Sequence, residues 1–292
     1  MKQNIIALGF FDGVHLGHGA LLQCTTQYQG TPQVLTFDQH PSSLLQTTPT
    51  PLLSSVEDRR WLISHYYGID RVIVCPFHEI MGMDWKDFIQ NYLINQLKIT
   101  HIVAGHDFRF GKGGEGTPEK LQALCVELGI GCDIVAPVLQ DGVVVSSTHI
   151  RTLIAKGEME RATEFLGHPH VISNEVVHGN KIGTKTLGFP TVNLQLPDGV
   201  IPPAFGVYAS RVYVDDQIFI GATNVGIRPT VESEGALSVE TFLLDYEGEL
   251  YGRHIRVEIH QFIRPEKKFD DFPSLSQQIA RDVESTRAYF AR

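Results

Sequence analysis

The sequence predicts two domains of different fold class, an α/β domain with a parallel sheet followed by an all-β domain that ends in a helix. The chain has 292 residues, and a single hydrophobic core rarely grows beyond roughly 250 residues. The first half alternates short apolar runs with helical patterns, whereas from His170 onward short strands follow one another until a final helix. We therefore expect a first domain at residues 1–157, a linker at 158–169 and a second domain at 170–292.

Five short runs rich in Ile and Val predict the strands of the first domain. Each run is mostly apolar, as in buried parallel strands, and each is followed by Gly, Pro or Asp. Helical patterns near residues 17–27, 56–67, 85–96 and 118–128 separate them. The alternation indicates a doubly wound sheet, whose ligands gather at the carboxyl ends of the strands. The expected strands are residues 4–8, 33–37, 71–75, 101–104 and 133–136.

The second half carries strand patterns after two short helices near residues 149–156 and 159–166. Turn signals such as Asp215 and Asp216 stand between the strands. Regularly spaced strands without intervening helices indicate a small barrel or sandwich. A last helix at 274–290 carries apolar residues at helical spacing. The expected strands are residues 171–177, 207–214, 217–224, 237–244 and 254–262.

Composition narrows the function classes. The chain has 24 Lys and Arg against 33 Asp and Glu, a formal charge of −9, which argues against a general nucleic-acid binder. Local backbone N–H groups can still bind phosphate on an acidic protein. The four cysteines form no CxxC pair and no apolar run reaches membrane-spanning length. We therefore expect a reduced, cytoplasmic protein that binds neither nucleic acid nor membrane, and no pattern indicates an oligomeric state.

The first chemical motif begins at Gly9 and reads GFFDGVHLGH. It follows a predicted strand and leads into a helix, where backbone N–H groups and the helix N-terminus can bind phosphate. His15 and His18 are three residues apart and would share one face of the first helical turn. Two imidazoles beside a triphosphate could stabilise the charge that develops on the α-phosphate and on leaving pyrophosphate. The alternatives are an ordinary glycine-containing turn with two surface histidines, or a zinc pair, for which no third ligand with suitable spacing is nearby.

Two further segments follow apolar runs, one of them the predicted strand at residues 101–104, so their side chains would meet the first motif at the same edge of the sheet. One reads GHDFRFG and includes Asp107 and Arg109, and the other reads SSTHIR and includes Ser147, Thr148 and Arg151. Arginine supplies fixed, bidentate contacts to phosphate. Either hydroxyl residue could equally be a plain N-cap, and the arginines could be solvated surface charges.

The second half has no GxxxxGK[ST] loop, so a Walker-type kinase is excluded. Residues 178–193 read HGNKIGTKTLGFPTVN instead, and their glycines allow the backbone to approach a phosphate closely. Thr191 and Asn193 alternate at a strand start, so they face the same way, and their oxygens suit Mg²⁺. Glu240 stands in a predicted strand among apolar residues, where it could be the general base for an attacking hydroxyl or simply point to solvent. The loop glycines are Gly179, Gly183 and Gly188.

These motifs resemble those of a known family. GFFDGVHLGH, GHDFRFG and SSTHIR look like the FAD synthetase module of the prokaryotic bifunctional riboflavin kinase/FAD synthetases, a module similar to the nucleotidylyltransferases that share HxGH. TFDQHP, which contains Asp38, is similar to the family's TFDPHP, although Gln39 stands where proline is usual. The resemblance implies a Rossmann-like nucleotidylyltransferase fold in which His15 and His18 are catalytic and Asp38 helps hold FMN or Mg²⁺. It implies ATP binding by Gly9, Phe10, His15, His18, Asp107, Arg109, Ser147, Thr148 and Arg151, and FMN binding by Asp38 and Asp107.

The resemblance continues through the second half. GTKTLGFPTVN, AFGVYAS, NVGIRPTV, VETFLLDYEGELYG and FIRPEKKF look like successive blocks of riboflavin kinase. They imply a small Greek-key β-barrel with a C-terminal helix, in which Thr191 and Asn193 bind Mg²⁺–ATP and Glu240 activates the ribityl 5′-hydroxyl. The loop with Gly179, Gly183 and Gly188 would close over the nucleotide. The implied enzyme uses ATP and Mg²⁺ to phosphorylate riboflavin to FMN, and then adenylylates FMN to FAD with release of pyrophosphate.

Three other functions compete with this hypothesis. One module could have lost its activity, the chain could be a flavin-binding regulator without turnover, or it could be a nucleotidylyltransferase for another acceptor such as phosphopantetheine. Every required residue is present in both halves, which argues against the first of these. The kinase-like second half argues against the last.

Overall fold

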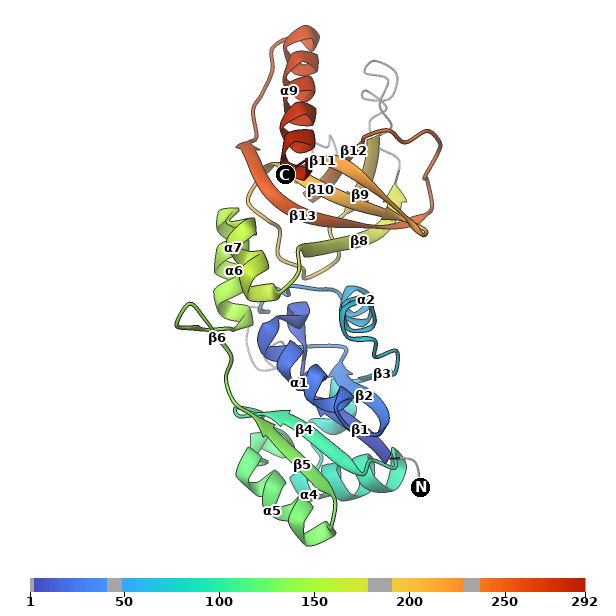
Figure 1. The fold of residues 1–292 in the computed structure, drawn as a ribbon, viewed down its shortest axis with the longest axis vertical. Coiled ribbons are helices and arrows are strands. Elements are labelled where there is room, and N and C mark those ends of the chain that lie inside the picture. The colour runs from blue at the N-terminus through green and yellow to red at the C-terminus, as the bar shows by residue number, and fades with distance from the viewer. Residues whose placement is uncertain (1–2, 41–48, 178–190, 228–236, 292) are drawn as a thin grey trace. The chain divides into compact units, whose positions relative to one another are not determined.

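Figure 1 shows the computed structural model, which describes residues 3–40, 49–177, 191–227 and 237–291. By their internal contacts the residues form two compact units. The first comprises Met1–Pro51 and Val56–Ser147, and the second comprises Leu52–Ser55 and Thr148–Arg292. The helix that begins at Ser147 therefore belongs almost wholly to the second unit.

A five-stranded parallel sheet forms the middle of the first unit (Figure 1). Its strand order is β3-β2-β1-β4-β5, and every neighbouring pair runs parallel, which confirms the predicted α/β fold class. Strands β2 and β3 lie on one side of β1, and β4 and β5 lie on its other side. Such a reversal opens a crevice at the carboxyl ends of the strands. The strands are β1 (Gln3–Leu8), β2 (Gly30–Phe37), β3 (Val72–Cys75), β4 (His101–Gly105) and β5 (Gly131–Val135).

Both faces of this sheet are buried, which explains why its strands are apolar runs rather than alternating patterns. Ile6 and Leu8 of β1 pack in a core with residues of η3 (Phe88–Gln96) and α5 (Pro118–Leu128). Ile5 and Ala7 are fully buried on the opposite face. Helices α1 (Leu16–Thr26) and α2 (Val56–Tyr67) also contact the strands.

Helix α5 shows how local sequence sets the bounds of an element. Thr117 is its N-cap and accepts a hydrogen bond from Lys120 N–H at 3.3 Å, and Pro118 fits the first turn because its missing N–H has no partner to lose there. Gly129 ends the helix in a left-handed conformation at φ 68°. These signals are readable in the sequence, and α5 covers the predicted residues 118–128.

Some elements differ from the prediction. The helix expected at 85–96 begins as α4 (Trp85–Asp87) and continues as the π-helix η3. The strands β6 (Leu139–Gln140) and β7 (Val143–Val144) form a hairpin that we did not predict, although its turn residues, Asp141 and Gly142, are a known hairpin signal. Further short elements are η1 (Asp12–Val14), α3 (Phe77–Ile80) and η4 (Lys112–Gly114).

A closed barrel forms the second unit, which decides between the barrel and the sandwich that the sequence left open. The strand order is β10-β11-β12-β9-β8-β13, every pair is antiparallel, and β10 pairs with β13 to close the ring. Helices α6 (Ser147–Lys156) and α7 (Met159–Leu166) precede the barrel, and the predicted final helix α9 (Phe272–Phe290) follows it. The strands are β8 (His170–Val177), β9 (Thr191–Gln195), β10 (Gly206–Val214), β11 (Gln217–Ile227), β12 (Leu237–Leu243) and β13 (His254–Pro265).

Hydroxyl groups cross the barrel strands in a chain. Ser210 Oγ donates to Gly221 O at 2.7 Å and shares a hydrogen bond of 2.6 Å with Thr223 Oγ1. Thr223 Oγ1 in turn lies 2.8 Å from Thr241 Oγ1. All three hydroxyl side chains are fully buried, so their hydrogen-bond partners must lie inside the barrel.

Candidate active sites

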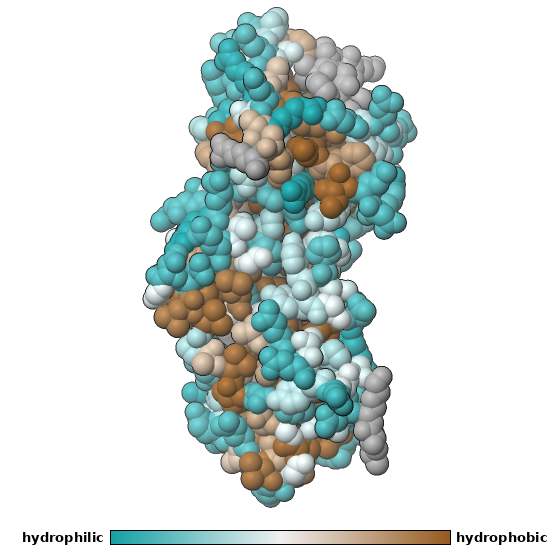
Figure 2. All heavy atoms as spheres, in the orientation of Figure 1, coloured by the Kyte–Doolittle hydropathy of each residue, from teal (hydrophilic) through white to brown (hydrophobic). Residues whose placement is uncertain are grey.

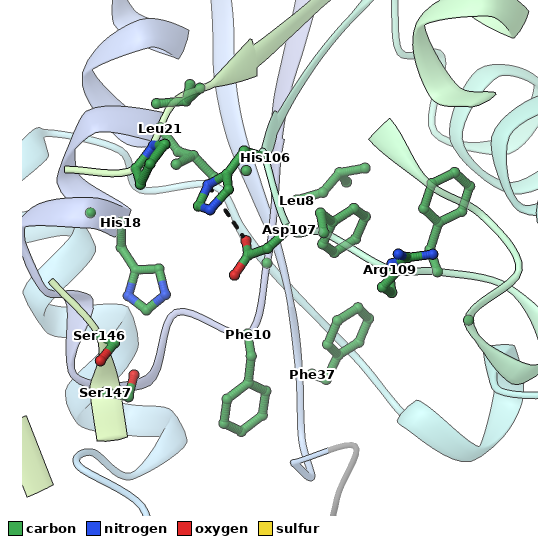
Figure 3. Close-up of a pocket in the computed structure, with 18 of the residues that line it drawn as sticks. Leu8, Phe10, His18, Leu21, Phe37, His106, Asp107, Arg109, Ser146 and Ser147 are labelled. Carbon is green, nitrogen blue, oxygen red and sulfur yellow. Dashed lines mark ion pairs between the residues drawn. The ribbon is translucent and has the colours of Figure 1, made fainter. Parts of the chain in front are cut away.

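A pocket of about 1120 Å³ opens at the carboxyl end of the sheet in the first unit. Its lining includes the last residues of four strands, which are Leu8 of β1, Phe37 of β2, Gly105 of β4 and Val135 of β5. The reversal of strand order beside β1 predicts a binding crevice at this place. Figure 3 shows side chains from the turn after β1, from the segment after β4 and from Ser146 and Ser147 around the same space.

The turn between β1 and α1 is strained. Phe11 and Val14 have positive φ angles of 57° and 44°, and a β-branched residue rarely adopts this left-handed conformation. Such residues cost about 1–3 kcal/mol each and are concentrated at binding and active sites. Gly9 N–H donates to Leu35 O at 3.2 Å, which ties the turn to β2. The strain favours ligand binding over an ordinary βα turn.

His15 and His18 form a stacked pair at the start of α1. His15 is the N-cap, and its Nδ1 accepts a hydrogen bond from His18 N–H at 3.3 Å. The ring centroids are 3.6 Å apart with 13° between the planes. Because Nδ1 of His15 is an acceptor, a neutral His15 carries its proton on Nε2. In Figure 3 the His18 ring points into the space bordered by Asp107, Ser146 and Ser147.

The surroundings of His18 keep it neutral. Burial is the largest cause that lowers the pKa of His18 well below 6.5, and the charges of His15 and Arg59 lower it further. The Nδ1 atom of His18 is buried without a hydrogen-bond partner among the residues that the structure describes. A neutral imidazole offers one N–H donor and one acceptor, so His18 can donate to a phosphate oxygen without adding a buried cation. The first turn of α1 adds backbone N–H groups for an anion.

The segment after β4 brings Asp107 and Arg109 to the same pocket. It turns tightly, because His106 N–H donates to Val135 O at 3.0 Å and Phe108 N–H donates to Gly105 O at 3.1 Å. The Asp107 carboxylate lies 4.0 Å from Nδ1 of His106, as the dashed line in Figure 3 marks. The structure thus collects a carboxylate, a guanidinium and the histidine pair around one space.

Three of the predicted residues lie elsewhere. Ser147 lines the pocket and donates to Asp12 O at 3.2 Å, but Thr148 and Arg151 lie on α6 in the second unit and are not among the described residues that line the pocket. Asp38 does not line it either. Its Oδ1 accepts a hydrogen bond from Phe77 N–H at 2.8 Å, which connects the end of β2 to the start of α3.

Sequence reasoning missed most of the aromatic wall of the pocket, of which it named only Phe10. Phe37 and Phe77 are in ring contact at 5.6 Å, and Phe108 and Phe110 stack at 5.6 Å. Flat apolar surfaces of this kind suit a planar aromatic ligand. Several of these residues stand inside the motifs themselves, where they could be mistaken for core packing. The phenylalanines that line the pocket are Phe10, Phe37, Phe77, Phe88, Phe108 and Phe110.

The β6–β7 hairpin adds an aliphatic rim to this pocket. Val144 lines the pocket and is 49% exposed, and Leu139 and Val143 beside it are 57% and 41% exposed. Figure 2 shows hydrophobic side chains gathered at this hairpin. Exposed apolar clusters mark places where a ligand or partner is bound.

The second unit carries a row of polar residues on neighbouring strands. Asn193 of β9 lies directly opposite Glu240 of β12, and Asn224 of β11 lies opposite Glu240 on its other side. Directly opposite residues have Cβ atoms about 4.5–5.5 Å apart and share one face of the sheet. Thr191 faces the same way as Asn193, and its Oγ1 is buried with no hydrogen-bond partner in the described part of the chain. Sequence reasoning did not single out Asn224.

The glycine loop lies outside the described residues, and with it Gly179, Gly183 and Gly188. Within the described ranges no group of three or more His, Cys, Asp or Glu side chains could hold a metal ion. No helix among these residues is long and apolar enough to cross a bilayer.

The fold and the two groups of residues define a class of protein, a two-domain enzyme for phosphate-centred transfer. Residues 1–149 match the family model of FAD synthetase, and residues 166–290 match that of riboflavin kinase. The chain belongs to the family of bifunctional riboflavin kinase/FMN adenylyltransferases. It is an enzyme of flavin cofactor synthesis that phosphorylates riboflavin to FMN and adenylylates FMN to FAD, with ATP as co-substrate.

The relatives cover almost the whole chain. A bifunctional riboflavin kinase/FMN adenylyltransferase of Listeria monocytogenes is 36% identical over 99% of this chain and 93% of its own length. The enzyme of the same name from Escherichia coli K12 is 37% identical over 98% and 92%. A crystal structure of a Streptococcus pneumoniae protein described as a macrolide-efflux protein is 29% identical, covers 98% of this chain and 94% of that chain, and superposes with a TM-score of 0.82.

Proposed function

We propose that adenylyl transfer takes place in the pocket of the first unit and riboflavin phosphorylation at the polar row of the barrel. The observation that carries the first assignment is the stacked pair of His15 and His18 at the N-terminus of α1, inside the pocket. The observation that carries the second is the register that sets Glu240 opposite Asn193. Each unit would thus perform one of the two reactions.

In adenylyl transfer an oxygen of the FMN phosphate attacks the α-phosphorus of ATP. The new O–P bond forms while the bond from the α-phosphorus to the oxygen bridging to the β-phosphate breaks, and pyrophosphate leaves. The attacking group is already an anion, so no general base is needed. His15, His18 and the N-terminus of α1 donate hydrogen bonds to the phosphate oxygens as negative charge moves to the leaving group. The aromatic wall would hold the flavin ring.

In the kinase reaction the ribityl 5′-hydroxyl of riboflavin attacks the γ-phosphorus of ATP, and ADP leaves. Glu240 takes the proton of that hydroxyl as the O–P bond forms. The strand positions that support this role are those of Glu240 and Asn193, which lie side by side on one face of neighbouring strands. A carboxylate held on a strand is positioned more firmly than one on a loop.

The residues present fit a magnesium ion in the barrel site. Thr191 Oγ1 is a buried oxygen without a hydrogen-bond partner in the described ranges, and the amide oxygen of Asn193 faces the same way. Mg²⁺ takes few protein oxygens and keeps several waters, so one hydroxyl and one amide suffice. When bound, Mg²⁺ supplies positive charge that neutralises the phosphate oxygens of ATP. We assign Thr191 and Asn193 as the residues that hold it.

Other residue roles rest on the family resemblance. Asp107, Arg109 and Ser147 line the pocket and would contact ATP, with Gly9 and Phe10 beside them. Asp107 is also the residue that we expect to contact FMN. Roles for Asp38, Thr148 and Arg151 stay predictions, as do those of Gly179, Gly183 and Gly188, the cytoplasmic location and the expectation that no nucleic acid is bound.

Paired variants test the assignment of one reaction to each unit. Flavins are separated by chromatography after incubation with ATP, Mg²⁺ and either riboflavin or FMN. We expect His18→Ala to accumulate FMN, with FAD formation reduced about 100-fold or more. We expect Glu240→Gln to leave riboflavin unconverted while supplied FMN still becomes FAD. The exposed residues His78 and Glu175 provide the matched controls, His78→Ala and Glu175→Gln. Loss of both activities in either folded variant would contradict the assignment.

A further inference from the structure

Helix α2 buries an arginine beside the adenylyl-transfer pocket. Arg59 is 0% exposed, whereas arginine is almost never fully buried without a partner. Its Nη1 donates to Thr36 Oγ1 at 2.8 Å and to Phe37 O at 2.9 Å, both at the carboxyl end of β2. Neither the sequence motifs nor the family resemblance singled out this residue.

Arg59 fixes the backbone of Phe10 through a hydroxyl. Thr36 Oγ1 lies 2.7 Å from Phe10 O and donates its proton there. A guanidinium can only donate hydrogen bonds, so the Thr36 oxygen must accept from Arg59 and its proton is left for the carbonyl of Phe10. The arginine therefore sets the direction of the Thr36–Phe10 hydrogen bond.

Arg59 also contacts the ring of Phe10. Its guanidinium carbon lies 4.1 Å from the ring centroid, a cation–π contact made by a fully buried guanidinium. The ring of His40 meets Phe10 edge-on at 4.7 Å. Phe10, Phe37 and His40 all line the pocket, whereas Arg59 does not. Arg59 thus contacts the backbone of Phe37 and the ring of Phe10, two residues that line the pocket, without lining the pocket itself.

The charge of Arg59 persists inside the protein. Burial lowers the pKa of Arg59 to about 10, and the charge of the buried Asp12 opposes this effect, so the side chain is cationic near neutral pH. Its Nε and Nη2 atoms have no hydrogen-bond partner within the described ranges. Unsatisfied buried donors destabilise a fold, so stability alone does not account for an arginine here.

We propose that Arg59 is a positioning residue of the adenylyl-transfer site, holding the Phe10 ring and the β1–α1 turn against the end of β2. The inference rests on the assignment of adenylyl transfer to this pocket. The turn that Phe10 begins leads directly to His15 and His18, so a shift of Phe10 displaces both the pocket wall and the phosphate donors. Misplacement by about 1 Å can reduce a rate about 100-fold.

The test compares five variants in the full-length chain. Arg59→Lys keeps the charge that balances Asp12 but loses the planar contact with Phe10, and Arg59→Met loses both. Arg60→Met is the matched control, because Arg60 is the next residue on α2 and is exposed. Phe10→Leu and the double variant with Arg59→Met complete a double-mutant cycle. For each protein, kcat and KM for FMN and ATP are measured in FAD formation. Riboflavin kinase activity is the internal control for the amount of active protein, and thermal unfolding of the chain is the control for folding of the first unit.

We expect Arg59→Lys to lower kcat for FAD formation about 10- to 100-fold with unchanged kinase activity, and Arg60→Met to match the parent. In the Phe10→Leu background, we expect the further change Arg59→Met to lower kcat for FAD formation by less than about 3-fold. The loss is small because the two residues act as one unit. Additive losses, or an Arg59→Lys enzyme with parent kcat and KM, would overturn the proposal. The Lys variant decides the question even where Arg59→Met does not fold. If His18→Ala and Phe10→Leu both leave FAD formation intact, the pocket assignment itself fails.

Discussion

Asn193 on β9 and Glu240 on β12 are direct cross-strand neighbours, so the backbone hydrogen bonds of the barrel fix their separation. Thr191 lies two residues before Asn193 on the same face, opposite Phe242. The groups that we assign to the metal and to proton removal therefore stand on one rigid surface. Strand-borne groups hold catalytic geometry more closely than loop-borne groups do.

Removing the Thr191 hydroxyl should weaken magnesium use in the kinase reaction only. We expect Thr191→Val to need about tenfold more Mg²⁺ for half-maximal riboflavin phosphorylation, because one oxygen ligand is lost. Thr191→Ser keeps the hydroxyl and should stay near the parent enzyme. The measurement is kinase rate against Mg²⁺ concentration at fixed ATP. An unchanged Mg²⁺ dependence in Thr191→Val would remove Thr191 from the metal site.

A buried histidine should make the second unit sensitive to acid. His170 on β8 is 2% exposed, and burial, followed by the nearby His168, lowers its pKa from 6.5 to about 3. Because the unfolded chain takes up the proton more readily, stability is complete above pH 6.5 and falls as the pH drops from 6.5 towards 3. From these values we expect about 2 kcal/mol less stability at pH 5 than at pH 7.5 from this residue.

The measurement for His170 is the urea midpoint of kinase activity at both pH values. His170→Leu should flatten the pH dependence, whereas His254→Leu, a change at an exposed histidine of the same unit, should keep it. Equal pH dependence in the parent and in His170→Leu would show that another group titrates instead.

Losing one member of the hydroxyl chain should destabilise the barrel. We expect Thr223→Val to lower the free energy of unfolding of this unit by about 1–3 kcal/mol, because Thr241 loses its hydroxyl partner in the buried interior. Thr152→Val, at an exposed position of α6, should stay within about 0.5 kcal/mol of the parent. Denaturation followed by kinase activity measures both. A neutral Thr223→Val would mean that the chain contributes packing alone.

A fragment that keeps α6 and α7 should be more stable than the barrel alone. Helix α7 contacts β8 and β13 and buries Met159, Phe165 and Leu166. We expect residues 148–292 to melt about 5–10 °C above residues 168–292, with kinase activity in both. Identical melting temperatures would place the start of the folding domain after α7.

The order of the strands within each sheet could not be predicted from the sequence. Nearly every long helix and strand was predicted. The runs around Ile5 and Ile102 are mostly apolar because both faces of the sheet are covered, and α5 is delimited by Thr117 and Gly129. Element boundaries shifted by only a few residues. The β6–β7 hairpin is too short for a periodic pattern, and its Asp-Gly turn was the sole local signal.

The candidate sites were predicted unevenly. Chemistry-bearing residues inside motifs, such as His18 and Asp107, do line the pocket, because the motifs follow the ends of parallel strands. Arg59 was missed because its role depends on contacts with residues 22 and 23 positions earlier, which no local pattern encodes. Asn224 was missed for a similar reason, since only strand register brings it beside Glu240.

The closure of the barrel by β10 and β13 has a consequence for how the protein aggregates on heating. A closed ring presents no unpaired strand edge in its described strands, so it offers no template for pairing with a neighbouring chain. The first unit ends instead in two open margins, β3 and β5. Heat-induced aggregation should therefore start from those edge strands. The strands of the barrel should become available for pairing with another chain only after the barrel unfolds.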